Sequence, residues 1–169
     1  MDIFYNNTKS NEEQCIYNID NNILYKLSSF TYSIAAIYCI IKIKNIKKVL
    51  PNIPIEILIF SVLFNGITSY LSDVVYINQL NNIWYKIDLV LATINTLLCI
   101  LVVLIIIFNS KKYKINLISI YALSIGIIYG LISKHLAVKN KNDSDKYIFW
   151  HTMWHISIPL GFGISVYFL

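Results

Sequence analysis

Long apolar stretches separated by short polar segments dominate the pattern of this 169-residue chain. A helix needs about 20 predominantly apolar residues to cross a bilayer. Five stretches approach or exceed that length, and each is predicted to form one membrane-spanning helix: residues 23–43, 54–76, 84–108, 115–133 and 147–169. A polar N-terminal segment, residues 1–22, precedes them. The pattern therefore predicts an all-α, polytopic transmembrane helix bundle of about five spans, with almost no soluble domain.

The composition supports a membrane protein. The chain is 57% hydrophobic and 14% charged, whereas a soluble domain is roughly 45–50% apolar and about 25% charged. The net charge of +5 comes from lysine, and a basic chain can indicate a nucleic-acid partner. Here the lysines lie between apolar spans, so we expect no nucleic acid and assign them to membrane topology. The three isolated cysteines indicate neither a disulfide framework nor a cysteine metal site.

The lysines also predict an orientation. They cluster at residues 42–48 and 111–114, in two loops that lie on the same side of the predicted bundle. The positive-inside rule makes that side cytosolic. The N-terminus and the loops near residues 77–83 and 134–146 are then luminal or extracellular, in an endomembrane or the plasma membrane. The polar N-terminus lacks the basic start of a cleaved signal peptide, so the first span is expected to stay as an anchor.

Ionisable residues inside the spans are the informative ones, because each costs roughly 2.5–3.5 kcal/mol at mid-bilayer on insertion scales. The candidates are Glu56, Asp73, Asp88, His151 and His155. Glu56, one turn into the second span, is interpreted as a carboxylate at a helix N-terminus near the interface. The other four lie near the outer ends of three different spans. The predicted topology therefore brings two acids and two imidazoles to one membrane depth.

The two histidines have the spacing of a metal site. His151 and His155 are four residues apart, so they lie on one helix face and can bind one zinc ion. Two axial haem ligands must approach from opposite faces, which excludes haem for this pair. A lone core histidine is more often satisfied by hydrogen bonds than bound to metal, and Asp73 or Asp88 could be an interfacial acid in contact with water only. Because two carboxylates are predicted to lie opposite the two histidines, we favour a metal site over these alternatives.

Polar residues also form stripes on two spans. Asn65, Ser69 and Asp73 repeat every four residues on the second span, and Asp88 and Asn95 are seven apart on the third. These stripes are predicted to face each other inside the bundle, away from lipid. Ser69 could reach a histidine, but no nucleophile-elbow motif supports a serine hydrolase. Serine is also common at helix contacts in membranes.

Two further features limit the alternatives. Gly126 and Gly130 form a small-xxx-small pair on the fourth span, which predicts close helix packing. A transporter or proton pathway would need polar residues along the full depth of the bundle. The stretch 97–108 is almost wholly aliphatic, which argues against such a pathway.

The fifth span reads His151-Thr-Met-Trp-His155-Ile-Ser-Ile-Pro-Leu. It resembles the H-x-x-W-H motif of the CREST superfamily of membrane hydrolases, which includes alkaline ceramidases, lipase-like GPI-remodelling proteins, adiponectin-receptor-type proteins and myomaker-like proteins. The run Ser69-Tyr-Leu-Ser-Asp73, followed by Asp88, is similar to the family's S-x-x-x-H and aspartate elements. The resemblance covers about residues 60–95 and 147–165. Two features depart from the family: Asp73 replaces its early histidine, and five spans replace its usual seven.

The resemblance implies a zinc-dependent intramembrane hydrolase of a lipid amide or ester, ceramidase-like or GPI- and phospholipid-like. Zinc would be bound by Asp73, His151 and His155, while Ser69 and Asp88 would be catalytic. His135, just past the predicted fourth span, is an alternative ligand to Asp73. The partner is a membrane lipid substrate, and a homo-oligomer could seal the reduced bundle. The competing hypothesis is a non-enzymatic CREST-like protein, receptor-like, fusogenic or scaffolding, which keeps the polar cluster for structure.

Overall fold

The structure is a computed structural model that describes residue 19 and residues 22–79, 82–113 and 115–169, without the side chains of Asn109 and Tyr113. Of the polar segment predicted for residues 1–22, all but Ile19 and Asn22 lies outside the described residues, as does Cys15. The described part is helical and contains no strand. The predicted all-α fold class is therefore confirmed.

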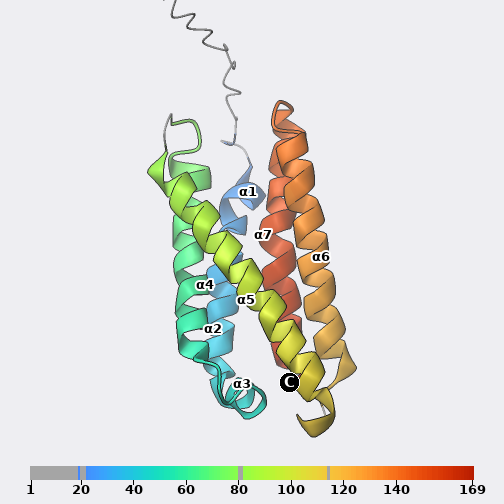
Figure 1. The fold of residues 1–169 in the computed structure, drawn as a ribbon. Coiled ribbons are helices and arrows are strands. Elements are labelled where there is room, and N and C mark those ends of the chain that lie inside the picture. The colour runs from blue at the N-terminus through green and yellow to red at the C-terminus, as the bar shows by residue number, and fades with distance from the viewer. Residues whose placement is uncertain (1–18, 20–21, 80–81, 114) are drawn as a thin grey trace, which may run out of the picture.

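Eight helical segments form a bundle whose long helices run along one common direction, with α5 crossing the others obliquely (Figure 1). The segments are α1 Ile23–Ser28, α2 Thr31–Ile41, α3 Ile43–Val49, α4 Ile55–Tyr70, the π-helix η1 Leu71–Val75, α5 Ile83–Tyr113, α6 Leu117–Lys139 and α7 Ser144–Tyr167. The segment η1, the start of α5 and the α6–α7 turn lie at one end of the bundle. The α3 segment and the C-terminus lie at the other.

Within the described residues, four helical stretches are long and apolar enough to cross a membrane: Ile23–Ile41, Ile55–Val75, Ile83–Phe108 and Leu117–Lys139. The fifth predicted span, α7, has 24 residues, or about 36 Å at 1.5 Å per residue. It is long enough to cross a membrane but less apolar than the other four. Its polar residues are compatible with the fold, because α7 packs along α6 and also contacts α1 and α2. It can therefore direct polar side chains into the bundle instead of toward lipid.

Two of the predicted boundaries differ from the structure. The first span is interrupted, since α1 ends at Ser28 and α2 begins at Thr31. The fourth helix continues to Lys139, where Asn140 caps it and donates a side-chain hydrogen bond to the Leu136 carbonyl at 2.7 Å. Lys134 and His135 therefore lie on α6 and not in the loop predicted to begin there. The loop itself is reduced to residues 140–143.

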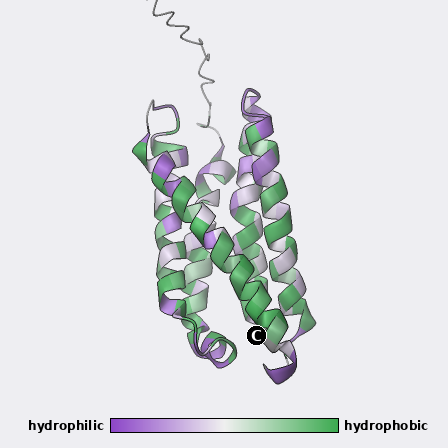
Figure 2. Ribbon diagram, in the orientation of Figure 1, coloured by the Kyte–Doolittle hydropathy of each residue, from purple (hydrophilic) through white to green (hydrophobic). Residues whose placement is uncertain are grey.

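The outside of the bundle is apolar, as a lipid-facing surface should be. Large hydrophobic side chains are widely exposed, among them Ile57 and Phe60, each 70% exposed. Soluble monomers rarely expose contiguous apolar patches of more than a few hundred Å². Figure 2 shows hydrophilic residues gathered toward the ends of the bundle and a strongly hydrophobic lower half of α5. This distribution is that of a membrane protein.

The α6–α7 pair packs closely at glycines. A Cβ atom built on Gly126 would lie 2.9 Å from the Cα of Gly161, and one built on Gly161 would lie 2.6 Å from the Ala122 carbonyl oxygen. A Cβ on Gly130 would meet the Ile158 side chain at 2.7 Å. The packing role predicted for Gly126 and Gly130 is thus confirmed, and the close approach fixes α7 against α6.

Candidate metal centre

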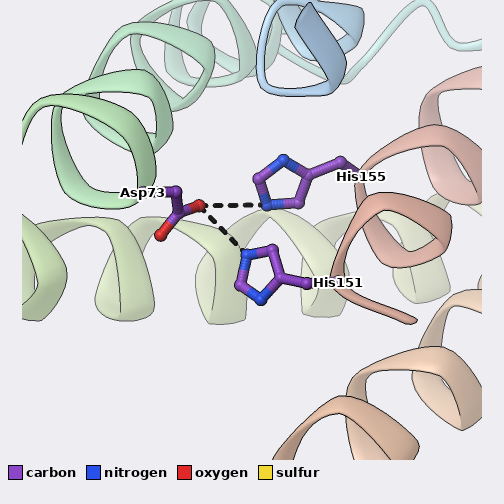
Figure 3. A group of neighbouring side chains, drawn as sticks. All are labelled: Asp73, His151 and His155. Atoms are coloured by element: carbon purple, nitrogen blue, oxygen red, sulfur yellow. Dashed lines mark hydrogen bonds and ion pairs between the residues drawn. The ribbon is translucent and has the colours of Figure 1, made fainter. Parts of the chain in front are cut away.

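Three side chains from two distant parts of the sequence converge near one end of the bundle (Figure 3). The Oδ2 atom of Asp73 lies 3.0 Å from Nε2 of His151 and 3.3 Å from Nε2 of His155. All three candidate ligand atoms lie within 4.8 Å of one another. Asp73 and His155 are buried, while His151 is half-buried. The convergence predicted for these three residues is therefore present.

Local structure explains how the three groups meet. His151 and His155 are separated by one turn of α7, and their ring centroids are 4.6 Å apart. Asp73 lies on η1, the π-helical turn that continues α4. Short π-helical turns are rare and frequently occur at functional sites. Here the wider turn carries the carboxylate that reaches both imidazoles.

The distances fit a metal site. Ligand atoms about 2.0–2.2 Å from one zinc ion in tetrahedral geometry are roughly 3.3–3.5 Å apart. The separations of Asp73 Oδ2 from the two Nε2 atoms, 3.0 and 3.3 Å, lie at or just below that range. Two imidazoles and one carboxylate also form a known catalytic zinc ligand set, which leaves a fourth position open. The same distances suit hydrogen bonds, so the cluster is also stable as a carboxylate bonded to two imidazoles.

Two serine hydroxyls lie beside Nδ1, the second ring nitrogen of His155. The Oγ atoms of Ser28 and Ser29 each lie 3.4 Å from its Nδ1. The break between α1 and α2 places both serines at this depth. Metal-binding histidines almost always use their second ring nitrogen in such a hydrogen bond, which fixes the ring. Sequence reasoning missed both residues, although adjacent serines inside an apolar span were a usable signal.

Two more serines contact the carboxylate of Asp73. Ser69 Oγ donates to Oδ2 at 3.3 Å and also lies 3.3 Å from Nε2 of His155. Ser72, which was not among the predicted site residues, donates to Oδ1 at 3.0 Å. Both oxygens of the buried Asp73 are therefore engaged. Ser69 lies at the centre of the site, in contact with two of the three candidate ligands.

The polar stripes on α4 and α5 face each other as predicted. Asn65 donates to Oδ1 of Asp88 at 3.2 Å, and Asn95 donates to the Asn65 side-chain carbonyl at 2.9 Å. Ser61 continues the chain with a 2.8 Å hydrogen bond to Asn95 Oδ1. Asp88 is half-buried and interacts electrostatically with Asp73. It is not one of the three candidate metal ligands. The asparagines hold this second carboxylate beside the site.

Aromatic rings enclose the histidines. Tyr32 packs edge-on against the His155 ring at a centroid distance of 5.7 Å, and Tyr25 and Tyr147 lie 5.8 and 5.1 Å from the His151 ring. The hydroxyl of Tyr32 is buried and has no hydrogen-bond partner among the described residues. It lies within electrostatic range of Asp88 and Asp73. A buried hydroxyl without a partner is costly, so this group is suited to a ligand of the site.

The remaining candidates lie elsewhere. His135 is exposed on α6 and is not part of the grouped ligands, so the structure gives no support to it as a substitute for Asp73. Glu56 lies in the first turn of α4 and forms an exposed ion pair with Lys47 of α3. Its predicted place at a helix N-terminus is confirmed.

Comparison with protein-family models, curated proteins and solved structures found no match to this chain.

Proposed function

We propose that this membrane protein is a zinc-dependent intramembrane hydrolase that cleaves an amide or ester bond of a lipid. The observation that carries the proposal is the convergence of Asp73 Oδ2 with the Nε2 atoms of His151 and His155 inside an apolar bundle. Ionisable groups inside a bundle of membrane-spanning helices are expensive and usually functional. The resemblance of the H-x-x-W-H motif to the CREST superfamily supports the same reaction class.

Asp73, His151 and His155 would hold the ion. Ser28 and Ser29 would fix the ring of His155 through its Nδ1. Imidazole and carboxylate ligands suit zinc. A bound zinc ion supplies two effects, a lowered pKa for the water it holds and polarisation of a substrate carbonyl. These effects match hydrolysis of an amide or ester.

The other residues of the site have separate tasks. We assign to Asp88, whose Oδ1 accepts a hydrogen bond from Asn65, the role of accepting a proton at its carboxylate. Ser69 and Tyr32 carry hydroxyls that can donate to negative charge on the substrate oxygen. Hydrogen-bond donors that are held in place before the reaction stabilise developing charge most effectively in a water-poor site. A lipid substrate would reach these groups laterally from the bilayer.

One observation favours a second function, a structural polar cluster in a receptor-like, fusogenic or scaffolding protein. Both oxygens of Asp73 are already engaged by protein groups, namely His151, His155, Ser69 and Ser72. A satisfied buried network rigidifies a bundle without any catalysis. The two functions predict different behaviour for Asp88, which contributes to chemistry in one and to packing in the other.

The test uses the full chain purified in detergent or nanodiscs, loaded with zinc and offered ceramides, phospholipids and GPI-type lipids. We expect hydrolysis that a chelator abolishes and zinc restores. The Asp88→Asn variant should lose at least 100-fold in rate, within the range for a general acid–base group, while its zinc content and thermal stability stay unchanged. A zinc-loaded protein without hydrolysis, whose Asp88→Asn variant is destabilised, would establish the structural function instead.

A further inference from the structure

The side chain of Lys134 reaches the edge of the candidate metal centre. Lys134 lies on α6, which runs beside α7 along the bundle (Figure 1). Its Nζ atom is 4.8 Å from the centroid of the Trp154 ring. Trp154 is buried and lies between His151 and His155 in the H-x-x-W-H motif. The ammonium group is therefore held at the level of the candidate ligands, and not out in the loop.

The surroundings leave this ammonium available. Lys134 is half-buried, and among the described residues no carboxylate lies within 4.0 Å of its Nζ atom. Asp88 is near enough to interact with it electrostatically, as is His155. By contrast, Lys47 and Lys146 form ion pairs, with Glu56 and Asp143 respectively. A cation over an aromatic face gains roughly 0.5–2 kcal/mol, which holds the charge without neutralising it.

The balance of charge at the site favours an anion. With zinc bound and both Asp73 and Asp88 ionised, the formal charges of the ion and the two carboxylates cancel. Lys134 would then leave the site with a net positive charge. Lysine is a common binder of phosphate groups, acting as a compact point charge.

We propose that Lys134, held over Trp154, binds the phosphate of an anionic lipid, so that the substrate is a phosphate-bearing lipid and not an uncharged ceramide. This inference rests on the hydrolase function proposed above and names its substrate class. The simpler alternative is a lysine that lies along apolar surface and extends its charge to the interface. That alternative predicts no selectivity among lipids with and without phosphate.

The first experiment measures binding by the zinc-loaded full chain. The probes are dihexanoyl phosphatidic acid, dihexanoylglycerol, glycerol 3-phosphate and inorganic phosphate, measured by calorimetry in nanodiscs. We expect phosphatidic acid to bind at least tenfold more tightly than each of the other three. Equal binding of phosphatidic acid and dihexanoylglycerol would overturn the inference. Equal binding of phosphatidic acid and inorganic phosphate would show a free-phosphate site and would overturn the lipid part.

The second experiment compares two lysines of the same helix. Lys134→Met should lower phosphatidic acid affinity at least tenfold and leave dihexanoylglycerol binding unchanged. Lys139→Met, which removes an exposed lysine nearer the end of α6, is the matched control and should stay within twofold of wild type. Lys134→Arg keeps the charge and should retain binding, which covers the case in which Lys134→Met fails to fold. An equal loss in the Lys134 and Lys139 variants would indicate surface electrostatics and contradict the inference.

Zinc content and hydrolysis measured on the same samples separate the two proposals. Selective, Lys134-dependent binding of phosphatidic acid without hydrolysis of any lipid would refute the hydrolase and retain the phosphate site. Zinc-dependent hydrolysis that prefers ceramide, and that Lys134→Met does not affect, would retain the hydrolase and refute the substrate class.

Discussion

The two halves of the bundle are packed by different means. Near the α6–α7 turn, the interior holds Asp73, His155 and Asn65, each at most 4% exposed. Toward the α3 end, the interior is formed mainly by apolar side chains such as Ile46 and Ile106, which are equally buried, and its polar contact between α6 and α7 is the neutral Ser119–Ser165 pair. The same helices thus close over ionisable groups in one half and over a mostly apolar interior without them in the other. Close packing of these helices therefore does not by itself require the cluster around Asp73 and His155.

The difference has an energetic meaning. Charged groups within the bilayer cost roughly 2.5–3.5 kcal/mol each on insertion scales. The apolar half avoids that cost and still buries residues from α3, α4 and α5. Residues that are costly to bury and unnecessary for closure are best explained by binding or catalysis. Substitutions confined to one half should therefore perturb that half and leave the other intact.

The largest effect is expected for His155→Ala. Loss of one of three candidate ligands should weaken zinc binding by more than roughly 100-fold, because even outer-shell changes cost 10–100-fold. Zinc content per protein, measured by mass spectrometry after dialysis against a weak chelator, checks this. His135→Ala removes an exposed imidazole on α6 and is the matched control, with no change expected. Equal zinc retention in both variants would refute the metal centre.

The next effect concerns the α6–α7 contact in the apolar half. Gly161→Ala places a Cβ 2.6 Å from the Ala122 carbonyl oxygen and 2.9 Å from Gly126 Cα. Such overpacking costs about 1–3 kcal/mol, and thermal unfolding in detergent should detect it.

Gly163→Ala on the same helix is the control for Gly161→Ala. A Cβ at Gly163 meets nothing within 4 Å, and alanine is the better helix former. We expect it to match or slightly exceed wild type in stability. If the folded Gly161→Ala protein binds zinc normally, the two halves are separable. A joint loss of stability and zinc affinity would show that they are coupled.

A smaller effect is expected when the serines around His155 are changed. Ser28→Ala combined with Ser29→Ala removes both hydroxyls that lie 3.4 Å from Nδ1. Zinc affinity should fall about tenfold, at the lower end of the range for outer-shell partners. Each single variant should fall less, because one hydroxyl remains. Competition titration with a chromogenic chelator measures all three. An unchanged affinity in the double variant would mean that these hydroxyls do not orient the ring.

Helical periodicity explains how much of this site the sequence could predict. His151 and His155 share a face because they are four residues apart, and the stripes led by Asn65 and Asp88 meet as their spacing requires. Adjacent serines inside an apolar span could have marked Ser28 and Ser29 as unusual, but their contact with His155 could not be predicted, because it depends on a helix break and on a partner more than 120 residues away. Lys134 was missed for another reason. Its helix runs on to Lys139, whereas the apolar pattern ends at Ser133.

The smallest effect on stability and zinc binding is expected for a variant that tests the polar half for a conflict between stability and function. Tyr32→Phe removes a buried hydroxyl that has no hydrogen-bond partner among the described residues. Leaving such a group unsatisfied costs about 1–3 kcal/mol, so the variant should be as stable as wild type or more stable by about 1 kcal/mol. Its ring can still pack against His155, so zinc content should not change.

Under the proposed function, hydrolysis by Tyr32→Phe should nevertheless fall about 10–100-fold, because the hydroxyl proposed to donate to the substrate oxygen is then missing. Tyr121→Phe, on an exposed residue of α6, is the control and should alter neither property. A destabilised Tyr32→Phe protein would show that the hydroxyl is satisfied within the fold. A gain in stability together with a loss of activity would show that the polar half gives up stability for chemistry, which is the trade-off expected of an active site.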